Sequence, residues 1–217
     1  MEHISHLKAA ALAAFTMAGG VVSAYAQITI ETVTVGNIGN AANGSYGAVA
    51  YEFQIGKYEV TNAQYAAFLN VVAATDTYSL YNTNMGSSGA GGITRSGSSG
   101  SYTYATKSGF ETKPVNYVSF WDAARFANWL NNGQGSAGTE TGSYTLGSVT
   151  NPVNGSVTRN EGANWVVTSE NEWVKAAYYD PTKDGVGGYW LYPTKSGSIT
   201  TADANYANSI GTVTNVG

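Results

Sequence analysis

The stretch Lys113–Gly133 decides the fold and reads KPVNYVSFWDAARFANWLNNG. Its first residues, including Pro114-Val115, favour an extended segment. Ser119 is a favourable N-cap with Asp122 three residues later, and Gly133 suits the position just past a helix end. The stretch therefore predicts an extended segment followed by one capped helix.

The predicted helix carries large aromatic residues on its polar side. Trp121 and Trp129 lie eight positions apart with Arg125 between them. Either the helix is buried on both sides, or these three side chains form a ladder that faces a ligand. Aromatic residues at helical spacing are mostly core residues, which favours burial, with residues 76–112 as the cover. The expected apolar face is formed by Phe120, Ala123, Ala124, Ala127 and Leu130.

A second helix is predicted upstream, in the segment 57–75. Thr61 and Gln64 form a capping box, and apolar side chains then recur with helical spacing. The apolar positions are Tyr65, Phe68, Leu69 and Val72.

A third helix is predicted in the segment 168–181, where Thr168 or Ser169 is the cap and Pro181 ends the helix. We expect Trp173 to face inward with Ala176 and Ala177. We also expect Glu172 and Lys175, three positions apart, to form an ion pair. Strands are expected at residues 27–35, 48–58, 144–146, 156–159 and 165–167, with a short hairpin at 101–106.

The composition limits the possible partners. Only 11% of the 217 residues are charged, and the net charge is −4. With a pI near 5.1 and scattered Lys and Arg residues, no basic patch is available to neutralise phosphates. Nucleic acid is therefore not an expected partner.

Residues 1–26 have the pattern of a secretory signal peptide. A short polar start is followed by an apolar run and by Ala24-Tyr25-Ala26, a typical cleavage pattern. We expect export to the periplasm, the cell surface or the medium, with membrane attachment only through an anchor that this chain does not contain. Both histidines, His3 and His6, lie in this leader, and there is no cysteine. Residues 27–217 therefore contain no Ser-His-Asp triad, Cys-His pair or ordinary zinc site.

Three blocks together resemble the formylglycine-generating enzyme, or sulfatase-modifying factor, family, and in particular its exported bacterial members. The blocks are KYEVTNAQYAAFL (57–69), KPVNYVSFWDAARFANWLN (113–131), and VVTSENEWVKAAYYDP (166–181) followed by GYWLYPT and ANYAN. The resemblance implies an α+β fold of the C-type-lectin-like kind, with short helices packed on irregular antiparallel sheets and long ordered loops. It implies a single domain at 27–217 that is incomplete at its C-terminus.

The resemblance also concerns metals. Some family members oxidise a sulfatase cysteine to formylglycine through two cysteines that bind copper. Copper is expected here only if cysteines come from a C-terminal part that this chain lacks. A family calcium site in the "Y-A-N-x" turn corresponds to Asn208 and Ser209, which are the candidate calcium ligands.

Three functions are compatible with these observations. The first is a non-catalytic binding or cell-surface module for a protein or glycan, because loops rich in Tyr, Ser and Gly supply adaptable contacts. The second is the formylglycine-generating oxidase, with its catalytic segment outside this chain. The third is a carboxylate-based hydrolase using Glu170 and Glu172, although these two point apart on a helix. Other candidate carboxylates are Glu111, Asp122 and Asp203, and the candidate ligand contacts are Arg95, Tyr102, Tyr104 and Trp190.

Overall fold

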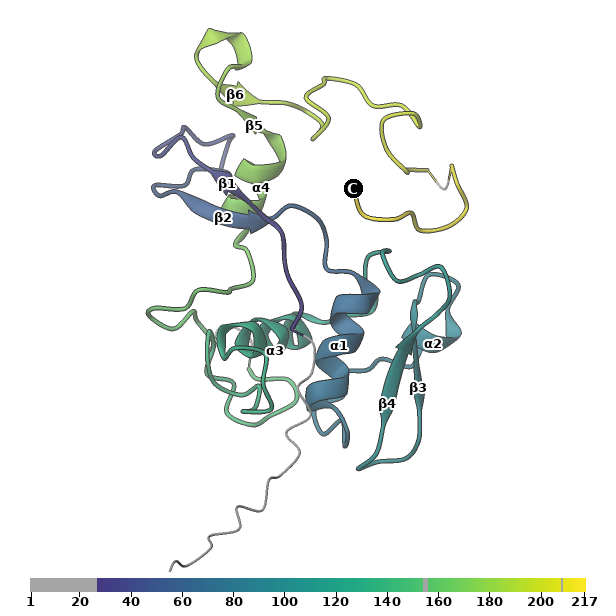
Figure 1. Ribbon diagram of the computed structural model, residues 1–217. Helices are drawn as coiled ribbons and strands as arrows, with labels where there is room; N and C mark the ends of the chain where they lie inside the picture. The colour runs from purple at the N-terminus through teal and green to yellow at the C-terminus, as the bar shows by residue number, and fades with distance from the viewer. Residues whose placement is uncertain (1–26, 154–155, 208) are drawn as a thin grey trace, which may run out of the picture.

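The computed structural model describes residues 27–153, 156–207 and 209–217 (Figure 1). The predicted signal peptide at 1–26 lies outside the described residues. The helices are α1 (Asn62–Val72), α2 (Asn84–Ser87), α3 (Phe120–Asn131) and α4 (Glu170–Tyr178), with a 3-10 turn at Lys183–Gly185. The strands are β1 (Thr32–Val35), β2 (Phe53–Gly56), β3 (Ile93–Ser96), β4 (Thr103–Thr106), β5 (Tyr179–Asp180) and β6 (Gly188–Tyr189). Within these residues, no helix is long and apolar enough to cross a membrane.

The strands form three separate antiparallel pairs. In the first, β1 pairs with β2, with Val33 opposite Ile55. In the second, β3 pairs with β4, so that Arg95 lies opposite Tyr104. In the third, β5 pairs with β6, with Tyr179 opposite Tyr189. Short helices beside small antiparallel sheets agree with the expected α+β class.

The three long helices begin at capping boxes. Thr61 caps α1 together with Gln64, Ser119 caps α3 together with Asp122, and Ser169 caps α4 together with Glu172. In each box a side-chain oxygen accepts from the backbone of the third helical residue, and that residue's side chain accepts from the cap backbone. The predicted helix starts are confirmed, and each cap contributes about 1 kcal/mol to stability.

The main core lies between α1, α3 and the β3–β4 hairpin. In Figure 1, α1 lies between α3 and the hairpin. Phe68 of α1 packs on Phe126 and Trp129 of α3, with 5.3 Å between ring centroids in both pairs. The segment 76–112 closes this core with Leu80, Tyr81, Met85, Ile93 and Tyr104.

A smaller core lies on another side of α3. Ala124 and Ala127 pack there against Tyr144 and Leu146, and the half-buried Trp121 covers them. Helix α3 is therefore buried on both sides, as predicted, and its two tryptophans contribute to different clusters. The predicted cover by residues 76–112 is wrong for Trp121, because residues from the segment 144–167 pack on that side and 76–112 pack only on the side of Trp129. The predicted apolar face is wrong at Phe120, which is half exposed because it sits in the first turn of the helix, beyond the edge of the smaller core.

Helix α4 differs most from its prediction. Trp173 is 52% exposed, whereas Glu172 and Lys175 are buried. The two charged residues do not pair with each other. Glu172 pairs with Arg159, and the Lys175 ammonium donates to the carbonyl of Asn37 at 3.1 Å. Hydrogen bonds to other segments thus stabilise the buried orientation of Glu172 and Lys175, and the Trp173 indole faces solvent.

Some predicted strands do not form. Residues 144–146, 156–159 and 165–167 contain no strand, and only the isolated bridge between Tyr144 and Arg159 joins the first two segments. Side-chain hydrogen bonds hold these segments instead. The Tyr144 hydroxyl, for example, accepts from the amide of Val167 at 2.9 Å.

Candidate functional site

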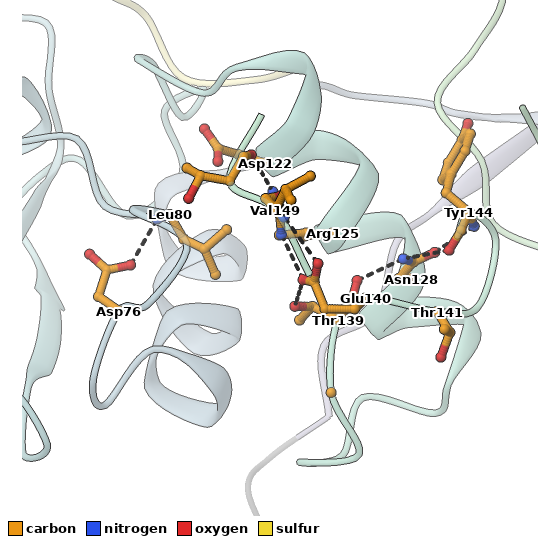
Figure 2. Close-up of polar contacts among 12 residues, drawn as sticks. Asp76, Leu80, Asp122, Arg125, Asn128, Thr139, Glu140, Thr141, Tyr144 and Val149 are labelled. Carbon is orange, nitrogen blue, oxygen red and sulfur yellow. Dashed lines mark hydrogen bonds and ion pairs between the residues drawn. The ribbon is translucent and has the colours of Figure 1, made fainter. Parts of the chain in front are cut away.

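Arg125 lies at the centre of a buried polar network along α3 (Figure 2). Its side chain is fully buried and forms a two-pronged ion pair with Glu140, at 2.8 and 3.1 Å. The guanidinium also donates to the carbonyls of Thr150 and Val149, and it lies 4.4 Å from the ring centroid of Tyr78. Because the guanidinium makes four hydrogen bonds inside the protein, Arg125 does not form part of an exposed ladder that faces a ligand. Arg125 therefore organises the loop that follows α3.

Asn128, one turn further along α3, holds the next part of the same loop. Its amide donates to the carbonyls of Thr139 and Tyr144, and its oxygen accepts from the amide of Tyr144 at 2.7 Å (Figure 2). The carboxamide is completely buried, and all these bonds lie inside the protein. Asn128 therefore has a structural role, because its carboxamide has no free hydrogen-bonding group for a ligand.

Two buried carboxylates flank the α1–α3 contact. Burial raises the pKa of Asp76 and of Asp122 above the usual range for aspartate. Asp122 accepts from the amide and hydroxyl of Ser119, whereas Asp76 accepts from the amide of Leu80 and pairs with Arg95 at 3.0 Å. Asp122, one of the candidate hydrolase carboxylates, thus acts as a helix cap.

The predicted ligand contacts fall into two places. Arg95, Tyr102 and Tyr104 come together on the β3–β4 hairpin, where the Arg95 guanidinium lies between the rings of Tyr81 and Tyr102, at 4.8 and 4.3 Å. Tyr104 lies in the core and donates to the carbonyl of Ala73, and burial raises its pKa to about 12. Its ring anchors the hairpin. A ligand role for Arg95 and Tyr102 stays a prediction.

Glu172 forms a second polar network at the start of α4. Its carboxylate accepts from Arg159 at 2.8 and 2.6 Å, from the Tyr51 hydroxyl at 2.6 Å and from the amide of Ser169. Burial opposes ionisation, but these hydrogen bonds outweigh it and lower the pKa of Glu172 to about 2. The carboxylate is therefore held as an anion. Its neighbour Glu170 is exposed, so the two do not form an acid–base pair.

We expect Glu172 to make folding sensitive to acid. Its folded pKa lies below its usual value, so its contribution is fully present above about pH 4.5 and is lost towards about pH 2, on the order of 3 kcal/mol in all. Urea unfolding of the wild type and of Glu172→Gln near neutral pH and near pH 2.5 measures this contribution. The stability gap between them should shrink in acid, and an equal gap at both pH values would contradict the assignment.

Trp190 lies away from the hairpin, in a shallow groove of about 480 Å³. The groove is uncharged and largely aromatic. The turn 43–46, the end of α4 and the residues from Tyr189 onward form it. Its lining residues are Asn43, Tyr46, Val174, Tyr178, Tyr189, Trp190 and Leu191.

Sequence reasoning singled out Trp190 but missed the rest of this groove. Tyr46 follows a turn-forming Asn-Gly-Ser, and Tyr178 ends a helix. The local sequence around each tyrosine therefore gave no reason to assign it to a binding site. Exposed aromatic residues close to a turn were the only available signal. Local pattern could not place Tyr46 beside Trp190, because their proximity depends on the packing of the turn 43–46 against α4.

The structure leaves the calcium prediction untested. Asn208 lies outside the described residues, and Ser209 is exposed, with its hydroxyl 3.4 Å from the side-chain oxygen of Asn205. Across the ranges that the structure describes, no three His, Cys, Asp or Glu residues gather as a metal site. Copper bound by paired thiolates does not fit this chain, since it has no cysteine.

Comparison with known families finds a match over most of the chain. The model of a family described as "Sulfatase-modifying factor enzyme 1-like domain" matches residues 14–213. No curated protein and no solved structure matches the chain. The matched range contains all the helices and strands described above.

Proposed function

Because the chain belongs to the family of sulfatase-modifying factor enzyme 1-like domains, we propose that it is an exported binding domain that recognises a protein or a glycan without catalysing a reaction. Its fold is of the C-type-lectin-like kind. The observation that carries the proposal is the aromatic groove at Trp190, in which, among the described residues, the Asn43 carboxamide and the hydroxyls of Tyr46 and Tyr178 form no hydrogen bond.

The contrast with the other polar groups supports this proposal. Arg125, Asn128 and Glu172 are saturated by hydrogen bonds inside the protein, so they maintain the fold. The groove instead offers ring faces and side-chain hydrogen-bonding groups to the solvent. Contact surfaces that combine Tyr or Trp with small polar residues bind at a low cost in conformational entropy.

The available side chains also favour binding over oxidation. The oxidising members that this chain resembles use two cysteines to bind copper, and none of the 217 residues here is a cysteine. Beyond the leader there is no histidine either. Export is included in the proposal because residues 1–26 have the pattern of a signal peptide.

Arrays of glycans and proteins, probed with the labelled full chain, test this function. We expect saturable binding to at least one class of molecule. We expect Trp190→Phe to weaken it in a chain that still folds, with a small fall in melting temperature because the indole's hydrogen bond to Asp180 is lost. The matched control is Trp173→Phe, which alters an exposed indole outside the groove lining. The proposal fails if the folded chain binds nothing on either array.

The alternative is a role in formylglycine formation, with thiolates supplied from outside these 217 residues. Family membership is the observation that favours it. The assay incubates the full chain with copper, a small thiol as the outside source of thiolate, air and a peptide containing the sulfatase cysteine, and mass spectrometry detects the aldehyde. Conversion by the chain would replace the binding proposal, whereas an unchanged peptide combined with array binding would support it.

A further inference from the structure

The groove at Trp190 is built from three segments that hydrogen bonds hold together. The turn at Asn43 and Tyr46 is closed by two backbone bonds, of 2.8 and 3.2 Å. The amide of Gly47 then donates to the side chain of Asn171 on α4 at 2.9 Å. Figure 1 shows this N-terminal region beside α4 and the β5–β6 pair. The walls of the groove are therefore fixed relative to one another.

Two of the aromatic rings are also fixed at their polar ends. The Tyr189 hydroxyl donates to the carbonyl of Gly47 at 2.7 Å and accepts from the Asn40 amide at 2.7 Å. The Trp190 indole donates to the Asp180 carboxylate at 3.1 Å. A ligand that stacks on these rings pays little for ordering them, because their orientations are already set.

Among the residues that the structure describes, the groove has no charged side chain in its lining. Charged groups around Trp190 pair with one another, including Lys195 with Asp180 at 3.6 Å. Lys183 lies 5.0 Å from the Trp190 ring centroid but pairs with Asp184 at 2.6 Å. Asp180 accepts from the amide and hydroxyl of Thr182 as well as from Trp190. An anionic or cationic ligand would thus be desolvated here without a counter-charge, which is unfavourable.

Uncharged polar groups do remain. Among the described residues, no hydrogen bond joins the Asn43 carboxamide or the hydroxyls of Tyr46 and Tyr178 to another group. The backbone beside them is already paired, since the amide of Trp190 donates to the carbonyl of Tyr178 at 2.9 Å. A peptide ligand in strand conformation would need free backbone groups on the protein at this point. A ligand that carries hydroxyl groups needs only the free side-chain groups of the protein.

We propose that this groove binds a neutral saccharide. A pyranose ring has an apolar face of C–H groups, which packs on an aromatic ring, and a rim of hydroxyls, which pair with the Asn43 carboxamide and the tyrosine hydroxyls. The volume of about 480 Å³ lies within the range of small-molecule sites. This inference rests on the proposed binding function and narrows it to one ligand class and one site.

Calorimetric titration of the full chain with maltotriose, cellotriose and triacetylchitotriose tests the inference. We expect at least one of these neutral trisaccharides to bind, and we expect Tyr46→Ala to weaken it about tenfold or more. Tyr46 can be replaced with little effect on the fold because the residue is 48% exposed. The matched control is Tyr58→Ala, which removes the ring of a residue that is 40% exposed and lies outside the groove.

The outcomes separate this inference from the broader proposal. Loss of binding in Tyr46→Ala alone supports the saccharide site. Absence of trisaccharide binding to the wild type overturns the site, and the binding proposal survives only if the arrays identify a protein or a different glycan. Equal weakening in Tyr46→Ala and Tyr58→Ala also overturns it, because the effect would then not belong to this groove.

Discussion

Replacing Arg125 with methionine should lower the free energy of unfolding by about 3 to 5 kcal/mol. The guanidinium is fully buried, and Glu140, which it pairs with, has only 17% of its side chain exposed. Methionine fills much of the same volume but leaves that carboxylate without its counter-charge. It also leaves the carbonyls of Val149 and Thr150 without their donors. Breaking a buried pair from one side is costly because the other charge stays desolvated.

Two further variants identify the cause of the loss. Arg125→Lys keeps the charge but cannot reproduce the two-pronged contact with Glu140, so it should recover only part of the stability. Lys57→Met breaks an exposed ion pair with Glu31 and should leave the free energy of unfolding unchanged within error. Urea unfolding measures all three variants. If Arg125→Met loses less than about 1 kcal/mol, Arg125 is not the centre of this network.

The helices were predictable because their signals are local. Capping boxes at Thr61, Ser119 and Ser169 depend on residues three positions apart, and the structure has all of them. The burial of α3 was also predictable, because aromatic residues at helical spacing are mostly core residues. The α+β class follows from these helices together with the family match.

The contacts of α4 were not predictable from the sequence. Spacing alone pairs Glu172 with Lys175, but Glu172 instead accepts hydrogen bonds of 2.6 to 2.8 Å from Arg159 and Tyr51. Tyr51 lies 121 positions from Glu172 and Arg159 lies 13 positions before it, in an irregular segment, so only tertiary packing brings both to the helix. The exposure of Trp173 follows, because a helix that turns two buried charges inward must turn its opposite side outward.

The candidate groove shows the same limit. Trp190 was identified from its residue type, but Tyr46 and Asn43 reach it through the contact between Gly47 and Asn171. Arg95 was predicted as a ligand contact, yet Asp76, Tyr81 and Tyr102 surround it. Residue type can suggest which side chains bind, whereas their availability depends on hydrogen bonds that the fold creates.

Replacing Trp129 with alanine should lower the free energy of unfolding by about 3 to 5 kcal/mol, comparable to the loss of Arg125. The indole is only 1% exposed and packs on Phe68 and Phe126, with ring centroids at 5.3 and 5.7 Å. Its removal leaves a cavity at the junction of α1 and α3, which surrounding rings cannot collapse to fill. Thermal and urea unfolding measure the loss.

The variant Trp129→Phe separates the effect of lost packing on stability from the effect of removing the buried indole N–H. Within the described residues, the Trp129 indole nitrogen is buried without a hydrogen-bond partner. Phenylalanine removes this unsatisfied donor along with some volume, so Trp129→Phe should cost clearly less than Trp129→Ala. Trp173→Ala is the matched control, because that indole is half exposed and its loss should change stability by less than about 1 kcal/mol. Equal losses from Trp129→Ala and Trp173→Ala would contradict the packing described for α3 and α4.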